Sequence, residues 1–145
     1  MIILADQLII GPALALGLII GVYEWIVVHR DVDKAFQKQA LHGGQSLITA
    51  IIFTFCSMNA SFVLSVAPAL QNLPLVGQPL GLQIAIGLIA AIKIHGANQL
   101  KGASGVQGLK AGETWFHSVL IGALIAAAPY AYPLLEPVLP AWIKF

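Results

Sequence analysis

The stretch SLITAIIFTFCSMNASFVLSVA, residues 46–67, contains no charged residue. A helix needs about 20 mostly apolar residues to cross a bilayer, because lipid cannot hydrogen-bond to backbone amides and carbonyls. This stretch has that length and composition, so it predicts a transmembrane helix. The composition of the whole chain agrees, since 59% of its 145 residues are hydrophobic and only 9% are charged. A soluble domain carries about 25% charged residues, so we expect an all-α integral membrane protein.

Three further apolar stretches raise the predicted number of transmembrane helices to four. Their approximate ranges are residues 8–28, 76–94 and 114–135. Pro129 and Pro133 lie in the last of them, and we expect them to bend or end that helix. The sequence therefore predicts a single transmembrane domain over residues 1–145, a four-helix bundle with connecting loops at 29–45 and 95–113.

The distribution of positive charge predicts the orientation of these helices. Lys and Arg concentrate in the cytoplasmic loops of membrane proteins. Six of the seven basic residues fall in or beside the two predicted loops: Arg30, Lys34, Lys38, Lys93, Lys101 and Lys110. Both loops are therefore expected in the cytoplasm and both termini outside, in a multi-pass protein of the cell membrane.

A repeated spacing relates the two halves of the chain. It suggests two related helical hairpins, as in transporters built from parallel repeats, but chance similarity in an apolar chain is the favoured interpretation. Gly21 and His29 are eight residues apart at the end of the first predicted helix, as are Gly87 and His95 at the end of the third. His42 and His117 lie at the starts of the second and fourth predicted helices.

Small residues recur at four-residue spacing in three of the predicted helices. In lipid, such stripes let helix backbones approach closely. The internal core of the bundle is the favoured partner of these stripes, and another subunit is the alternative. The residues expected at helix contacts are Gly17, Gly21, Ser57, Ser61, Ser118 and Gly122.

Polar residues inside the predicted helices are expected to face protein rather than lipid. Glu24 shares a helix face with Gly17 and Gly21, which predicts a buried carboxylate. Lys93 is its expected counter-ion, unless its long stem reaches the interface instead. Asn59 is expected to form an interhelical hydrogen bond, and lining a solute path is its alternative role.

The acidic and histidine residues near the cytoplasmic side form a candidate metal site. Glu113 and His117 are four residues apart and share one helix face, and His42 and His95 are expected at the same depth. The alternative assigns Glu113 to favourable interaction with a helix dipole and His117 to the membrane interface. No other cofactor is predicted. The single cysteine, Cys56, excludes an internal disulfide and a cysteine-based zinc site.

Function is less constrained than membrane location. The chain has no HExxH motif, no nucleophile–base pattern and no basic cluster with interleaved aromatics, so we expect neither an enzyme nor a nucleic-acid-binding protein. In architecture it resembles the small polytopic subunits of respiratory or copper-monooxygenase complexes. That resemblance implies an accessory or structural subunit whose partners are the lipid bilayer and other transmembrane subunits or a second copy. The alternative is a small oligomeric transporter or channel for protons, a metal ion or a small solute.

Overall fold

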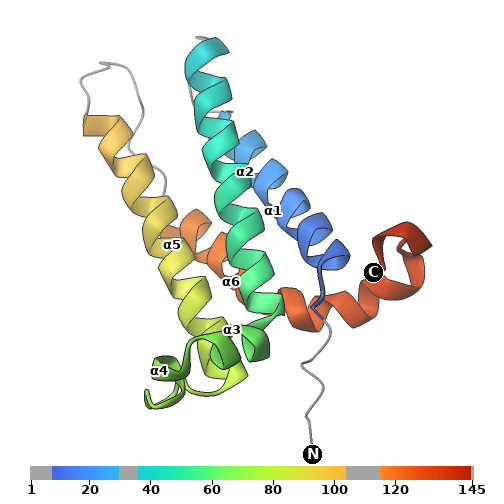
Figure 1. Cartoon of the computed structure of the whole chain (residues 1–145). Helices are drawn as coiled ribbons and strands as arrows, with labels where there is room; N and C mark the ends of the chain where they lie inside the picture. The colour runs from blue at the N-terminus through green and yellow to red at the C-terminus, as the bar shows by residue number, and fades with distance from the viewer. Residues whose placement is uncertain (1–7, 30–35, 104–114, 145) are drawn as a thin grey trace, which may run out of the picture.

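The computed structural model describes the backbone of residues 8–29, 36–103 and 115–144. Side chains are described for all of these except 28, 29, 36–43, 46 and 97–103. The described residues contain no β-strand, so the all-α prediction is confirmed for that part of the chain (Figure 1). The elements are α1 (Gly11–His29), α2 (Phe36–Met58), α3 (Ala60–Val66), α4 (Pro68–Gln71), α5 (Pro79–Ala103), α6 (Trp115–Leu135) and two 3-10 turns, η1 (Glu136–Val138) and η2 (Ala141–Ile143).

The long helices pack as two hairpins. α1 makes its most extensive contacts with α2, and α5 with α6, while α2 also contacts both α5 and α6. Figure 1 shows α1, α2 and α5 side by side, with α6 crossing behind them. The short helices α3 and α4 lie at the lower end, where α1 and α5 begin. We call residues 60–78 the elbow, this end of the bundle the elbow end, and the opposite end, with His29 and Trp115, the loop end.

The lengths of the apolar helices place the chain among helical membrane proteins, although they do not confirm four spans. Among the described residues, Pro79–Gly96 and Trp115–Val138 are long and apolar enough to cross a membrane. Leu47–Met58 with Ala60–Val66 makes a third if the bent pair counts as one span. The apolar part of α1, Gly11–Val27, is shorter.

The predicted second span is not a straight helix. α2 and α3 meet at Asn59 with a bend of 84°. The backbone of Asn59 leaves the helical region, at φ −112° and ψ 37°. Its side-chain amide donates to the Phe55 carbonyl four residues earlier, 2.9 Å away, where it competes with the helix backbone. An apolar pattern does not reveal this break, because both arms are equally hydrophobic.

Two other helix boundaries differ from the expected ones. α2 begins at Phe36 and α5 continues to Ala103, so helix occupies parts of the predicted loops 29–45 and 95–113.

α6 is not ended by its two prolines, because it continues through Pro129 and Pro133 to Leu135. Each proline removes only one backbone donor, and membrane helices tolerate that loss where neighbouring groups compensate.

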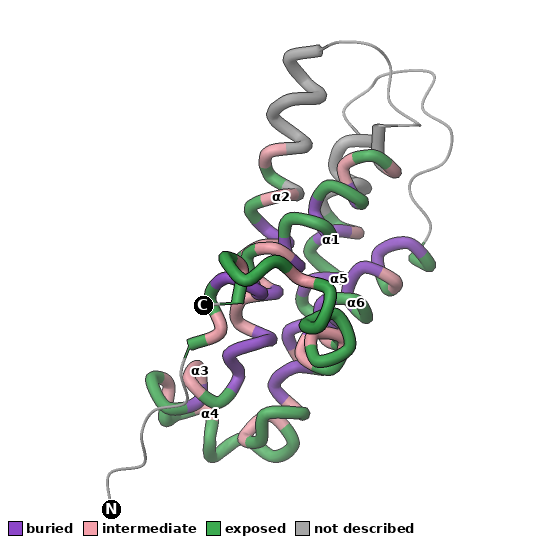
Figure 2. The backbone as a smooth tube through the Cα atoms, turned by 90° about the vertical axis from the view of Figure 1, so that its right-hand side faces the viewer, coloured by how far each residue is buried: buried purple, intermediate pink, exposed green. Residues whose placement is uncertain are grey.

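The core of the bundle is a layer of aliphatic residues. Ala50, Ala90, Ile121 and Ile125 have no exposed surface and belong to one cluster, to which α1 and α3 also contribute residues. Figure 2 shows buried residues along the facing sides of the long helices, whereas the elbow and the C-terminal turns are largely exposed. Many large apolar side chains on the outer helix faces are exposed as well, which suits contact with lipid.

The last part of the elbow, just before α5, is tightly turned. Leu75 adopts a positive φ of 70°, and the Val76 amide donates to the Pro74 carbonyl at 2.8 Å, closing a γ-turn around it. The Leu75 carbonyl then lies against Gly81, where a Cβ would clash with it. Only glycine at position 81 lets the loop fold back onto α5 in this way.

Candidate functional site: the buried polar groups of the bundle

Gly17 and Gly21 bring α1 into backbone contact with α2. A Cβ at Gly17 would lie 2.7 Å from the Ile51 Cα, and one at Gly21 would lie 2.9 Å from the Leu47 Cα. Both positions are buried. No larger side chain fits there without moving one helix away from the other.

Gly87 and Gly122 make the equivalent contact in the second hairpin. A Cβ at Gly87 would lie 2.6 Å from the Gly122 carbonyl oxygen, and one at Gly122 would meet the Gly87 carbonyl. Ser118, one turn before Gly122, is fully buried. Sequence reasoning identified Gly122 and Ser118 but not Gly87 as a packing residue. The four-residue spacing of Gly87 and Ala91 carries that signal, since the Ala91 Cβ also borders Gly122.

The serine stripe expected on the second span is interrupted by the bend. Ser57 is fully buried in α2, whereas Ser61 in α3 is exposed. Residues four apart share a face only on a continuous helix. The break at Asn59 therefore turns Ser61 away from the helix contact that the sequence predicts for it.

The loop end of the bundle contains two buried ionisable side chains. Glu24 on α1 is only 3% exposed, and His117 on α6 is 8% exposed. The ring of Tyr23, the residue before Glu24, lies 6.1 Å from the His117 ring. α1 and α6 pack against each other, so a carboxylate and an imidazole enter the interior from two neighbouring helices.

Of the two positions that the sequence allows for Lys93, buried beside Glu24 or reaching the surface, the structure shows the exposed one. It is exposed, its ammonium group lies 3.4 Å from Thr49 Oγ1, and it lies 5.8 Å from the centre of the Phe53 ring. These contacts are with α2, whereas Glu24 is on α1. The long aliphatic stem of lysine lets its charge reach the surface, which explains the exposed position.

The candidate metal ligands are only partly described. Glu113 and the side chain of His42 lie outside the described residues. His95 stacks on Trp115, with ring centres 3.8 Å apart, while His117 lies near Tyr23. Within the described part of the chain, no group of three His, Cys, Asp or Glu residues is arranged to hold a metal ion.

Asn59 ties the α2–α3 bend to the start of α1. Its Oδ1 accepts from the Ile9 amide at 2.7 Å, and its Nδ2 donates to the Ile9 carbonyl at 3.1 Å. The amide is 6% exposed and joins two backbones through both of its polar ends. This reciprocal pair places Asn59 in a helix-joining role at the elbow end.

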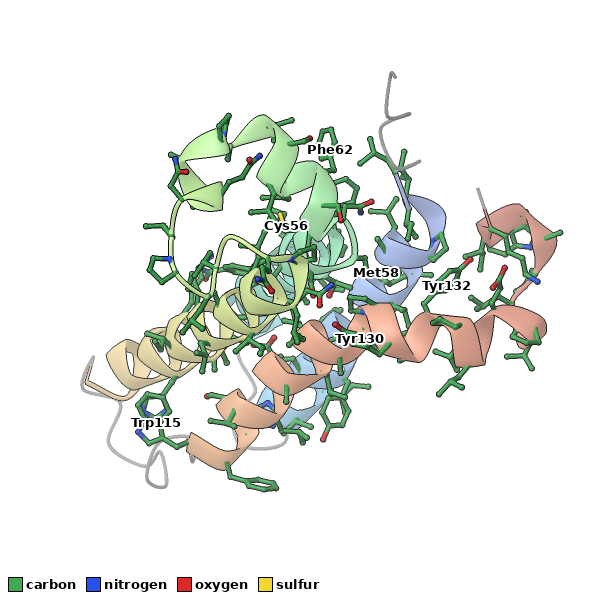
Figure 3. All side chains as sticks on the ribbon, turned by 90° about the horizontal axis from the view of Figure 1, so that it is seen from below. Cys56, Met58, Phe62, Trp115, Tyr130 and Tyr132 are labelled. Carbon is green, nitrogen blue, oxygen red and sulfur yellow. The ribbon has the colours of Figure 1, made fainter. Side chains whose placement is uncertain are left out.

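A second polar group at the elbow end was missed by sequence reasoning. Gln83 of α5 is 7% exposed, and its Nε2 donates to the Ser57 carbonyl at 3.3 Å. Tyr130 of α6, labelled in Figure 3, donates through its hydroxyl to Gln83 Oε1 at 2.7 Å. The fully buried Thr54 lies one turn before Ser57. A glutamine within an apolar span was the available signal, because such an amide requires internal partners.

The site thus consists of polar groups near both ends of the bundle, separated by the aliphatic layer. The groups at the loop end can hold a proton, and the amides and hydroxyls at the elbow end can bind only through neutral hydrogen bonds. Comparison with known protein families, characterised proteins and solved structures finds no match for this chain.

Proposed function

We propose that the chain crosses the membrane four times, with both termini and the connection between α3 and α5 outside and the loop end in the cytoplasm. The distribution of basic residues favours this orientation, because six of the seven lie in or beside the connections at the loop end. α1 would be the shortest span, and α2 with α3 the broken one. The two hairpins would be related by the repeat in which Gly21 corresponds to Gly87.

A reporter fused after Phe145 tests this arrangement. We expect it to report the outer compartment, and a second reporter placed after Gly105 should report the cytoplasm. Removing the positive charges at Lys101 and Lys110 should weaken the preference for this orientation. A cytoplasmic signal from the Phe145 fusion contradicts the orientation.

Within the membrane, the proposed function is that of an accessory or structural subunit of a larger complex. The closed centre of the bundle carries this proposal. Ala50, Ala90 and Ile121 have no exposed surface, and glycine contacts hold both hairpins at backbone distance. A bundle packed in this way suits a rigid framework more than a route for solutes, because close-packed cores resist continuous deformation.

The elbow is the surface on which we expect the partner subunit. Leu75 is 87% exposed, and its positive φ is unfavourable for a leucine. Val66 and Leu73 add exposed apolar surface nearby. Residues held in strained conformations concentrate at functional positions, which favours a binding role for this turn.

Purification from a mild detergent tests the subunit proposal. We expect the chain to co-migrate with other transmembrane proteins and to lose them when Leu75 is changed to Asn. Leu134→Asn is a matched control, since Leu134 is 80% exposed on α6, outside the elbow. A pure homo-oligomer that is unaffected by Leu75→Asn contradicts the proposal.

A proton carrier is the second candidate function, favoured by the buried carboxylate and imidazole at the loop end. Ionisable residues inside membrane proteins often mark proton routes. Reconstituted protein would then pass protons across vesicles loaded with a pH-sensitive dye, and Glu24→Gln would abolish that flux while leaving the fold intact. Vesicles without proton flux above background exclude this function for the isolated chain.

A further inference from the structure

Two buried hydroxyl groups of α2 face the interior without a hydrogen bond. Thr54 and Ser57 have no exposed surface, and neither hydroxyl has a partner among the described residues. Serine and threonine in helices commonly donate to the carbonyl four residues earlier, and these two do not. A buried hydroxyl without a partner is costly, so each calls for a ligand.

The two hydroxyls belong to one cluster with Gln83. Thr54 and Ser57 are three residues apart on α2, so they share a helix face. Gln83 of α5 donates one amide hydrogen to the Ser57 carbonyl, which brings the amide group to the backbone of the helical turn that carries both hydroxyls. The second amide hydrogen of Gln83 makes no bond to any described side chain or backbone group. The cluster therefore offers two hydroxyls and one N–H group.

We infer that Thr54, Ser57 and Gln83 bind internal water between α2 and α5. A buried water molecule makes about three hydrogen bonds to polar groups that otherwise lack partners, and this cluster supplies that number. Hydroxyls both donate and accept, so they match a water molecule in either orientation. Because the stretch from residue 46 to 92 contains no charged or histidine side chain, the cluster suits a neutral ligand rather than an ion.

Tyr130 connects this water site to the surface of the bundle. Its side chain is 56% exposed while its hydroxyl donates to Gln83 Oε1. The site also lies directly before the bend at Asn59, where the bound water would join α2 to α5. A structural subunit and a proton carrier could both contain such a site.

Removing the Thr54 hydroxyl gives opposite results with and without bound water. Thr54→Val keeps the shape of the side chain and deletes the hydroxyl. With water bound, we expect the midpoint of thermal unfolding in lipid nanodiscs to fall by roughly 2–4 °C. Thr54→Ser keeps the hydroxyl and should retain water, and Ser65→Ala removes an exposed hydroxyl as the control. A midpoint that rises or stays unchanged in Thr54→Val overturns the inference, because an empty site gains from losing an unpaired hydroxyl.

A direct measurement of water contact provides the second test. Solid-state NMR of the full chain in bilayers can follow magnetisation from water to threonine Cβ atoms, and the sequence contains only Thr49, Thr54 and Thr114. We expect transfer to Thr54 despite its burial and no comparable transfer to Ile125, which is equally buried but apolar. The Thr54 signal should persist in Thr54→Ser as a serine signal. Transfer to Thr54 no faster than to Ile125 overturns the inference.

Discussion

α1 and α5, the first helices of the two hairpins, have nearly the same pattern of buried and exposed residues. When residues 16–27 of α1 are aligned with residues 82–93 of α5, burial follows nearly the same order along both helices. Extended to the end of α1, the alignment contains five pairs of identical residues. They are Leu16 and Leu82, Ile20 and Ile86, Gly21 and Gly87, Ile26 and Ile92, and His29 and His95.

The buried polar residues are what differ between the two helices. Glu24 of α1 matches Ala90 of α5, and Gln83 of α5 matches Gly17 of α1. All four positions are buried. Each hairpin thus uses the same glycine-centred contact and adds a polar group near a different end. The shared positions build the bundle, and the differing positions give each hairpin its own chemistry.

The largest expected effect comes from breaking the shared contact. Gly17→Leu with Gly21→Leu forces two side chains into the backbone of α2, at about 1–3 kcal/mol for each overpacked site. For the two sites together we expect a loss of about 2–6 kcal/mol in the free energy of unfolding, measured by detergent denaturation. Gly87→Leu should also lower the free energy of unfolding if the two hairpins are equivalent.

Gly44 supplies the matched control for this experiment. It lies in α2, and a Cβ there would meet nothing within 4 Å. Gly44→Leu should not destabilise the protein and should raise the free energy of unfolding by up to about 1 kcal/mol, because leucine has a higher helix propensity than glycine. Equal effects at Gly44 and at the Gly17–Gly21 pair would mean that helix propensity, not close packing, determines the result.

Glu24 tests the difference between the hairpins. Glu24→Ala gives α1 the residue that α5 has at the matching position, Ala90. Because Glu24 is buried, we expect a loss of about 1.5–3 kcal/mol, the range for hydrogen bonds to charged groups. Glu24→Gln keeps the shape and one acceptor and should lose less. If both variants unfold like the parent protein in the detergent assay, the carboxylate has no structural role.

The sequence predicted features that depend on spacing alone. Gly17, Gly21 and Gly122 were identified because four-residue stripes mark helix contacts whatever the partner. The burial of Glu24 followed from the same periodicity, since it shares the glycine face. The exposed position of Lys93 was not determined by periodicity, because a long side chain can leave the face on which its Cα lies.

Features that depend on the path of the backbone were not predictable. The bend at Asn59 arises because its amide bonds simultaneously to Phe55 and to Ile9, which is fifty residues away in sequence. The loss of Ser61 from the helix contact follows from that bend. The link between Gln83 and Tyr130 joins two helices whose relative register no local pattern specifies.

Asn59 offers a smaller effect, restricted to the elbow end. Asn59→Ala removes both bonds to Ile9, and we expect a loss of about 1–2 kcal/mol, since membrane hydrogen bonds contribute less than 2 kcal/mol each. The angle between α2 and α3 should also relax, which spin labels on Ile52 of α2 and Val66 of α3, both exposed, can report as a longer distance. Asn72→Ala is the control at an exposed position of the elbow. An unchanged label distance would show that the bend is fixed by other contacts.

The smallest expected effect comes from removing the hydrogen bond that Gln83 of α5 accepts from Tyr130. Tyr130→Phe deletes the hydroxyl that donates to Gln83 and leaves the ring in place. Because Tyr130 is more than half exposed, the loss should be only about 0.5–1 kcal/mol. Tyr132→Phe is the matched control, because its hydroxyl makes no hydrogen bond to a described residue. In a Gln83→Leu background the Tyr130→Phe change should cost nothing, since its acceptor is already gone. If Tyr130→Phe lowers the free energy of unfolding by its full amount in that background as well, the Tyr130 hydroxyl stabilises the protein through the surrounding lipid rather than through Gln83.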